Sequence, residues 1–350
     1  MVLPLPLNMT SLRTYATAAL RRLAVLAGGV LLSRRAHRQL LLQRARAVQA
    51  LTDIEIRVLT EGLTGVVFSK DRALQLYTLL STYTRFVTNP APLVVLYAAS
   101  TAAHANAYSE LQAAFSGPGL NVQFVSQGPV FKESLQAILD DTITKNIFFL
   151  VDDIIFIRPV DFSLASRLDT SNSILSLRHS PHLRRSYTAS VPQSPPNFDV
   201  PKDCPGLLQF RWFEQKNEWS NPWSVDGQIL STAEIRVLTR ISEFWAPNSY
   251  EGALTTFNDL VTDRLGLCYP ESKILNLPIN RVQSEVANRN GDITSEYLLE
   301  KWNQGMTLDT SSFDAYVPES PHEEHSVLFK RRLGTPLNVD ESTRVEEGHS

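Results

Sequence analysis

The chain has 350 residues, and 43% of them are hydrophobic, so it is long enough to bury one large core or two modest ones. Its formal net charge of −3 excludes a generally basic surface for nucleic acid. The two cysteines, Cys204 and Cys268, exclude a disulfide framework and a metal knuckle, and so few cysteines favour a reducing compartment such as the cytoplasm.

Residues 1–52 form a segment whose charge differs from that of the rest of the chain. They include eight arginines and no acidic residue, whereas the remainder carries an excess of acidic residues. The apolar run Leu23–Leu32 is too short to span a bilayer, which takes about 20 residues. A secretory signal, an organelle transit peptide and a basic amphipathic helix on an anionic membrane surface are the alternatives. We expect peripheral membrane contact or a dispensable leader.

Beyond Ile54, short apolar runs alternate with segments that have helical periodicity. Strands are predicted at 65–68, 93–97, 122–125 and 147–151. Helices are predicted between them, at 74–83, 101–115 and 131–143. Strands that alternate with helices of this length indicate a three-layer α/β/α fold, in which a mostly parallel mixed sheet lies between two layers of helices.

Two carboxylates, Asp152 and Asp153, follow the last of these strands directly. Adjacent carboxylates at the end of a buried strand repel each other and are costly to desolvate, and a cation beside them removes that cost. Hard divalent ions prefer carboxylate oxygen, and ligands of open α/β sheets bind at the carboxyl ends of the strands. The pair therefore predicts a metal site, and a solvated strand end is the alternative.

Several nucleotide-binding folds share this alternation of strands and helices, and the sequence of the turn after the first strand distinguishes between them. It reads Ser69-Lys70-Asp71-Arg72, so it matches neither the Gly-rich fingerprint of dinucleotide-binding proteins nor a P-loop. With this polar turn, four βα units and an Asp-x-Asp-like motif after the fourth strand, the chain resembles the GT-A fold glycosyltransferases. The resemblance covers roughly Thr64 to Leu333 and implies a nucleotide-diphospho-sugar donor.

The resemblance also implies roles for particular residues. Asp153 would contact Mn²⁺ or Mg²⁺, Asp152 would assist it, and the ion would hold the diphosphate of the donor. The turn Ser69–Arg72 would meet the donor nucleotide. Many GT-A enzymes complete the metal shell with a C-terminal histidine, and His322 matches that position, with a solvated charged loop as the alternative.

The second half of the chain is more irregular, as an acceptor-binding half would be. Strands are predicted at 173–177 and 207–212, a closing strand and loop at 268–280, and a short helix at 295–303. Two tryptophans, Trp219 and Trp223, lie beside an Asp-Gly turn. Aromatic faces of this kind suit a sugar acceptor, and ordinary core packing is the alternative.

Two carboxylates in this half are candidates for the base that deprotonates an acceptor hydroxyl. Asp226 belongs to the Asp-Gly turn, and a turn residue is the alternative reading. Glu251 is expected in the first turn of a helix at about 250–265, where the macrodipole favours an anion. An inverting transferase needs one carboxylate within reach of the hydroxyl, whereas a retaining enzyme does not need it there.

The predicted domains are a basic leader at 1–52, a catalytic domain at 53–333 and a disordered tail at 334–350. The catalytic domain divides into a nucleotide-sugar half at 53–161 and an acceptor half at 162–333.

The sequence thus predicts a metal-dependent, hexosyltransferase-like glycosyltransferase whose acceptor is a carbohydrate, a lipid or a protein. A nucleotidyltransferase of similar fold is one alternative, and it would release pyrophosphate. A non-catalytic carbohydrate-binding or membrane-surface protein is the other, and it would show no metal-linked affinity for nucleotides.

Overall fold

The structure is a computed structural model that describes residues 34–117, 119–280 and 293–332. Its contacts divide the chain into two units, Met1–Ala50 and Leu51–Ser350. The predicted apolar run at 23–32 and the predicted tail at 334–350 lie outside the described residues.

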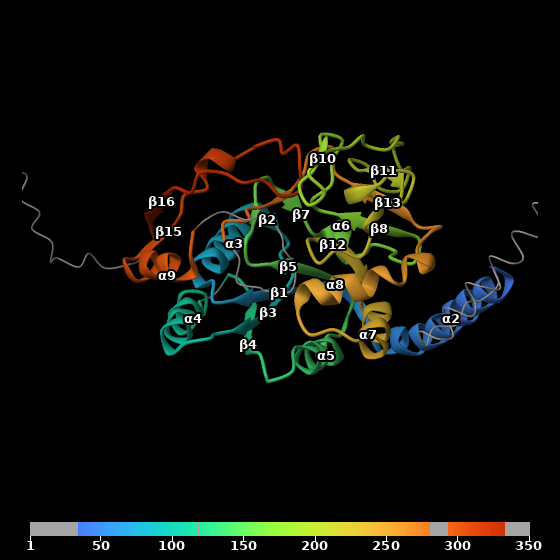
Figure 1. Ribbon diagram of the computed structural model, residues 1–350, viewed down its shortest axis with the longest axis horizontal. Helices are drawn as coiled ribbons and strands as arrows, with labels where there is room; N and C mark the ends of the chain where they lie inside the picture. Colours follow the sequence, from blue (N-terminus) through green and yellow to red (C-terminus); the bar gives the residue numbers. More distant parts are fainter. Residues whose placement is uncertain (1–33, 118, 281–292, 333–350) are drawn as a thin grey trace, which may run out of the picture. The chain divides into compact units, whose positions relative to one another are not determined.

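The unit Leu51–Ser350 is built on an eight-stranded mixed sheet with the order β11-β13-β8-β12-β5-β1-β3-β4 (Figure 1). Its strands are β1 (Thr60–Lys70), β3 (Leu93–Ala98), β4 (Val122–Ser126), β5 (Thr144–Val151), β8 (Ser173–Ser176), β11 (Leu208–Arg211), β12 (Gln228–Ser231) and β13 (Leu265–Cys268). The strands β4, β3, β1 and β5 are parallel to one another, and β12 is antiparallel to both of its neighbours. With helices on its faces, this sheet confirms the predicted α/β fold class.

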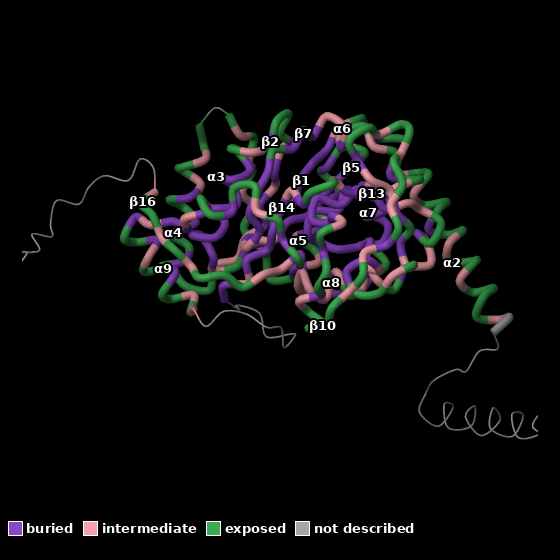
Figure 2. The backbone as a smooth tube through the Cα atoms, turned by 90° about the horizontal axis from the view of Figure 1, so that it is seen from above, coloured by how far each residue is buried: buried purple, intermediate pink, exposed green. Residues whose placement is uncertain are grey.

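Two groups of helices cover the sheet (Figure 1). One group packs together on one face and consists of α3 (Ala73–Phe86), α4 (Ala102–Ala114) and α9 (Ser295–Asn303). The other group consists of α5 (Phe131–Asp141), α7 (Thr232–Ile241) and α8 (Pro247–Thr255). The central strands β1 and β5 therefore lie in the buried interior (Figure 2).

Alternating residues of the central strands supply two separate cores. Val67 and Leu150 belong to the core under α3. Their neighbours Phe68 and Phe149 point to the opposite face, where their rings stack with centroids 5.6 Å apart, and Tyr250 of α8 packs edge-on against Phe149. Because strand side chains alternate between the faces, a continuous apolar run is required when both faces are covered.

The predicted elements of the first half are present, with some different bounds. β1 begins at Thr60 rather than at the predicted position 65, because its first residues run beside the start of β5. The Thr64 and Thr144 hydroxyls, 2.8 Å apart, hydrogen-bond between the two strands. α5 ends at Asp141, two residues before the predicted end.

Two corrections concern the helices of the second half. The helix predicted at 250–265 is wrong in length, because α8 ends at Thr255 and is followed by a 3₁₀ turn at Asn258–Leu260 and then by β13. α7 is a helix that the sequence analysis did not predict. Its N-cap is Ser231, whose hydroxyl accepts a hydrogen bond from the Glu234 amide at 3.4 Å.

One further helix, α2 (Arg34–Glu55), begins in the first unit. Its last residue, Glu55, belongs to the second unit and forms ion pairs with Arg236, at 3.0 Å, and with Arg240 of α7. Across the described ranges, no helix combines the length and the apolar character needed to cross a bilayer.

Candidate active site

One edge of the sheet gathers ionisable residues from four strands. Arg72 follows β1, Asp152 follows β5, and Arg178 comes two residues after β8. Asp226 precedes β12, which is antiparallel, so its first residues lie at the edge where the parallel strands end. The topology therefore brings together four residues that are far apart in the sequence, at the edge where α/β sheets bind ligands.

Gly227 makes the turn into β12 possible. Its φ of +84° is a left-handed conformation, and a Cβ at this position would lie 2.5 Å from Ile274 Cδ1. The Gly227 amide donates a hydrogen bond to the carbonyl of Phe149 in β5 at 2.8 Å. This bond holds Asp226 beside the end of β5.

The guanidinium of Arg72 lies between the two carboxylates of the strand end. Its Nη1 is 2.9 Å from Asp152 Oδ1 and 3.2 Å from Asp153 Oδ2, and its Nη2 donates to the carbonyl of Asn280. Burial would lower the pKa of Arg72, but the two carboxylates raise it, so the guanidinium stays charged. The side chain of Arg72 thus supplies a positive charge at the place where the sequence predicts a metal ion.

Asp152 is held by donors from the turn after β1. Its Oδ2 accepts hydrogen bonds from Ser69 Oγ at 2.8 Å and from the Lys70 amide at 3.2 Å. Its Oδ1 accepts the bond from Arg72. The carboxylate therefore ties the end of β5 to the turn that the resemblance assigns to donor binding.

The four predicted donor-binding residues of this turn differ in where they point. Ser69 and Arg72 reach Asp152, whereas the side chain of Lys70 is exposed. Asp71, at φ +56°, accepts hydrogen bonds from the amide and the hydroxyl of Ser100, both at 2.7 Å. Ser69 and Arg72 are therefore placed at the strand end, and Asp71 joins this turn to the one after β3.

The three predicted metal ligands are Asp153, Asp152 and His322. In the part of the chain that the structure describes, no three His, Cys, Asp or Glu side chains lie close enough together to hold a metal ion. The Asp153 carboxylate accepts from Asn276 Nδ2 at 2.8 Å as well as from Arg72. Because these donors already surround the carboxylates, the residues as arranged do not fit a divalent ion.

Asp226 faces two basic side chains. Its Oδ2 lies 3.1 Å from Arg178 Nη1 and 3.3 Å from His322 Nε2. Burial would raise the pKa of Asp226, but His322 and Arg178 lower it. Burial would lower the pKa of His322, but Asp226 raises it. Asp226 is therefore ionised at neutral pH.

Glu251 lies on α8 and binds the loop that precedes Asp226. Its carboxylate accepts hydrogen bonds from Asn221 Nδ2 at 2.6 Å and from the Val225 amide at 3.1 Å. Burial, together with the charge of Asp226, raises the pKa of Glu251. The predicted place in the first turn of a helix is wrong, because α8 begins at Pro247 and its first turn holds no acidic residue.

The predicted acceptor-binding tryptophans are core residues. Trp219 and Trp223 are both 0% exposed. The Trp219 ring packs against Phe210, with centroids 5.2 Å apart, and against His179 at 4.7 Å. A ring stacks on a sugar only if its face is accessible, so this geometry corrects the predicted stacking role.

The ionisable groups share one cavity of about 790 Å³. Its lining includes Arg72, Asp153, Arg178, Asp226, Glu251 and His322. The volume falls within the range of about 300–1,000 Å³ that is usual for small-molecule sites. The cavity therefore joins the predicted donor end of the site to both candidate bases.

Sequence reasoning missed several residues of this cavity. Arg178, Asn276, Asn280 and Tyr187 line it, but none of them was assigned a role. The sequence did contain a signal for Arg178. This residue directly follows the predicted strand 173–177, as Asp152 directly follows the predicted strand 147–151. The two asparagines come from β14 (Ile274–Asn276) and the segment after it, which no local pattern connects to the sheet edge.

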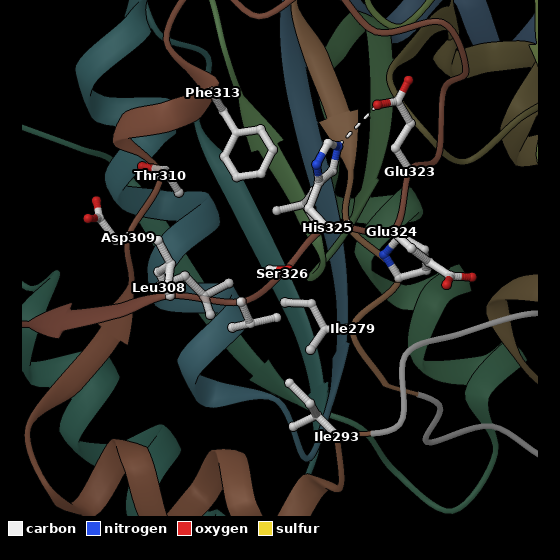
Figure 3. Close-up of a pocket in the computed structure, with 14 residues that line it drawn as sticks. Ile279, Ile293, Leu308, Asp309, Thr310, Phe313, Glu323, Glu324, His325 and Ser326 are labelled. Carbon is white, nitrogen blue, oxygen red and sulfur yellow. Dashed lines mark hydrogen bonds and ion pairs between the residues drawn. The ribbon is translucent and has the colours of Figure 1, made fainter.

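A second cavity, of about 210 Å³, lies beside the first and shares Pro278 with it. Figure 3 shows Ile279, Ile293 and Phe313 around it. The lining is mostly apolar, and the chemistry of the ionisable cluster belongs to the larger cavity.

Several solved structures resemble the chain at low TM-scores, whereas no protein-family model and no curated protein matches it. One of them is the crystal structure of S. aureus TarS 1-349. Its sequence is 12% identical to this chain, the match covers 61% of this chain and 59% of that chain, and the TM-score is 0.37. The 4-diphosphocytidyl-2C-methyl-D-erythritol synthase of Anaerococcus prevotii is 11% identical over 72% and 99% of the two chains, with a TM-score of 0.35.

The mannosyltransferase PcManGT from Pyrobaculum calidifontis, in complex with GDP-Man and Mn²⁺, is 15% identical over 42% of this chain and 53% of that chain, with a TM-score of 0.27. All three TM-scores are below 0.5, so these similarities assign neither a family nor an activity.

Proposed function

We propose that the protein is a glycosyltransferase that moves a sugar from a nucleotide-diphospho-sugar to an acceptor hydroxyl. The observation that carries the proposal is the single cavity in which Asp226 and Glu251 face the carboxyl end of β5. The pKa of Asp226 is lowered and that of Glu251 is raised. Carboxylates with shifted pKa values that line a cavity are typical of functional sites.

Asp226 is the proposed base of an inverting transfer. Its carboxylate takes the proton of the acceptor hydroxyl, and the acceptor oxygen bonds to the anomeric carbon of the sugar. The bond between that carbon and the diphosphate breaks, and the nucleoside diphosphate leaves with the electron pair. Both basic partners bind the same Asp226 oxygen, Oδ2, whereas both oxygens of Glu251 bind the loop at Asn221–Val225. Glu251 is therefore a positioning residue in this proposal.

The donor end of the site is proposed at the turn after β1. Ser69 and Arg72 are fixed there by Asp152, and Asp153 lies on the cavity wall. Asp152, Asp153 and His322, from which the sequence predicts metal dependence, do not fit a divalent ion as arranged. The proposed transfer therefore includes no metal ion.

A thermal-shift screen of nucleotide-sugars, with and without Mn²⁺, tests the proposal first. A donor that binds the native state should raise the melting temperature as its concentration rises above Kd. Release of nucleoside diphosphate with a panel of carbohydrate, lipid and peptide acceptors then tests transfer itself.

Other products would contradict the proposal. Release of pyrophosphate would assign the protein to the nucleotidyltransferases. The absence of stabilisation by every nucleotide-sugar, with and without Mn²⁺, would favour a non-catalytic protein that keeps the fold.

A further inference from the structure

Two buried arginines in the larger cavity have N–H groups without partners. Among the described residues, Arg72 Nε and the Nε and Nη2 atoms of Arg178 make no hydrogen bond. Their side chains are only 10% and 3% exposed. Glu218 Oε2 lies 3.4 Å from Arg178 Nη2, close enough for an ion pair but not for a hydrogen bond by geometry. Buried donors without acceptors are destabilising, so a ligand that brings acceptors would relieve the cost.

The carboxylates around these arginines are already engaged. Asp152 accepts three hydrogen bonds, and Asp153 accepts from Arg72 and Asn276. Asp226 is paired with Arg178. Among the described ionisable residues of the cavity wall, the buried atoms without a hydrogen-bond partner are therefore nitrogens of Arg72, Arg178 and His322. The guanidinium nitrogens among them are donors, which a ligand rich in acceptor oxygens would satisfy.

Some neutral groups on the same wall also lack partners. Asn280 Nδ2 is a further donor, and the amide oxygens of Asn221 and Asn276 are acceptors without donors among the described residues. A ligand with both phosphate oxygens and hydroxyl groups would satisfy both kinds of group. A nucleoside diphosphate carries them on its diphosphate and its ribose.

We propose, on the basis of the glycosyltransferase function above, that Arg72 and Arg178 hold the donor diphosphate directly, so that nucleotide binding needs no divalent cation. Arg72 occupies the place between Asp152 and Asp153 where the sequence predicts a metal ion. Guanidinium groups match phosphate oxygens in geometry as well as in charge.

Asp152 and Asp153 are positioning residues for Arg72 in this arrangement, and Asp226 positions Arg178 in addition to its proposed role as the base. Asp152 and Asp153 bind Nη1 of Arg72, and the Asn280 carbonyl binds its Nη2, so Nε is left for the ligand. Asp226 binds Nη1 of Arg178, and Glu218 forms an ion pair with its Nη2, so Nε is again left for the ligand. Each arginine is thus held at both Nη atoms and keeps an unpartnered Nε–H group. Pre-organised donors of this kind bind an anion without first losing side-chain freedom.

Calorimetric titration of the full chain with UDP, GDP, CDP, ADP and TDP tests the proposal, once in EDTA and once in Mn²⁺. We expect at least one nucleoside diphosphate to bind with Kd values that agree within about threefold between the two buffers. Arg178→Lys should weaken that binding by at least about tenfold, because lysine cannot offer a fixed fork of donors. Arg211→Lys is the matched control, because Arg211 is 69% exposed and should leave Kd unchanged.

The outcomes separate this inference from the proposed function. Binding that appears only with Mn²⁺ would overturn the metal-free site and leave the glycosyltransferase proposal standing. Binding of no nucleoside diphosphate in either buffer would overturn both. Binding in EDTA that Arg178→Lys leaves unchanged would overturn the assignment to the arginines. The wild-type titrations decide the metal question even if a variant does not fold.

Discussion

Asp226 and Glu251 carry the same functional group but have different surroundings. Asp226 pairs with Arg178 and His322, and these two cations keep it ionised. Glu251 accepts its hydrogen bonds from a side-chain amide and a backbone amide of one loop, and burial raises its pKa. The contacts of each residue therefore indicate its role better than its type does.

The amide variants of these two residues should separate base from positioning residue. Asp226→Asn should lower turnover by about 10²-fold or more, because an amide cannot take the proton. Nucleotide affinity should stay within a few-fold, because the amide oxygen can still accept from Arg178. Glu251→Gln should mainly lower the melting temperature. Steady-state kinetics, nucleotide titration and calorimetric melting measure the three quantities, and full turnover in Asp226→Asn would remove the carboxylate-base mechanism.

Gly227 offers a test of the turn that places Asp226. Gly227→Ala should destabilise the fold by about 2–3 kcal/mol, because its positive φ is strained for alanine and the new Cβ would meet Ile274. Gly252→Ala is the matched control, because it lies in α8 with open space around its Cα and should be neutral or slightly stabilising. Urea denaturation compares the two variants, and equal stability of both would contradict the turn geometry.

Among the elements, α7 is a helix that connects several parts of the second unit. Arg236 donates to the carbonyls of Leu139 at 2.7 Å and Asp140 at 3.0 Å, where α5 ends, and pairs with Glu55 at the end of α2. Cationic groups near a helix C-terminus satisfy free carbonyls and interact well with the dipole. These contacts link α2, α5 and α7 through one buried arginine.

The pairs at Glu55 predict a pH dependence of stability. Burial would raise the pKa of Glu55, but hydrogen bonds from Arg240 and Arg236 lower it below the ordinary value of 4.5. A carboxylate with a lowered folded-state pKa adds stability above pH 4.5, and this stability is lost as the pH falls through the folded-state pKa. Glu55→Gln should cost about 1 kcal/mol at pH 7, and the difference from wild type should shrink as the pH falls below 4.5.

Thermal melts of wild type and Glu55→Gln across this pH range check the sign. At pH 7 the melting temperature should differ by about 2 °C. A difference that grows on acidification would contradict the lowered pKa of Glu55. Glu243→Gln is the matched control, because Glu243 is 91% exposed and its pair with Lys132 should contribute little.

At the scale of the whole molecule, the division at residue 50 separates the N-terminal unit from the unit that holds the sheet. Every strand of the eight-stranded sheet lies in Leu51–Ser350. The ion pairs of Glu55 with α7 also lie inside that unit.

Removal of residues 1–50 should therefore leave a folded second unit. We expect the shortened chain to melt cooperatively and to keep the nucleotide affinity of the full chain within a few-fold. Circular dichroism melts and the calorimetric titration measure both. Aggregation, or a broad non-cooperative melt, would show that the N-terminal unit contributes to the core of the second unit.

The sequence by itself determined most of the sheet's first half. Continuous apolar runs such as Ile147–Val151 mark strands covered on both faces, and the helical periodicity between them specifies the crossovers. The same pattern places Asp152 and Asp153 at a strand end. An apolar run that stops at charged residues can be recognised from the local sequence alone, without information on distant contacts. α7 was missed although Ser231 and Glu234 have capping spacing.

Only the tertiary structure decided what surrounds those residues. Arg72 lies between the two carboxylates because β1 and β5 are neighbours in the sheet, and its other contact, the Asn280 carbonyl, is 208 residues away along the chain. Trp219 and Trp223 are buried because the second half folds over them, which the residue type alone does not indicate. Strand order and chain crossings bring such groups together, so the contents of the site depend on contacts over distances that no local pattern encodes.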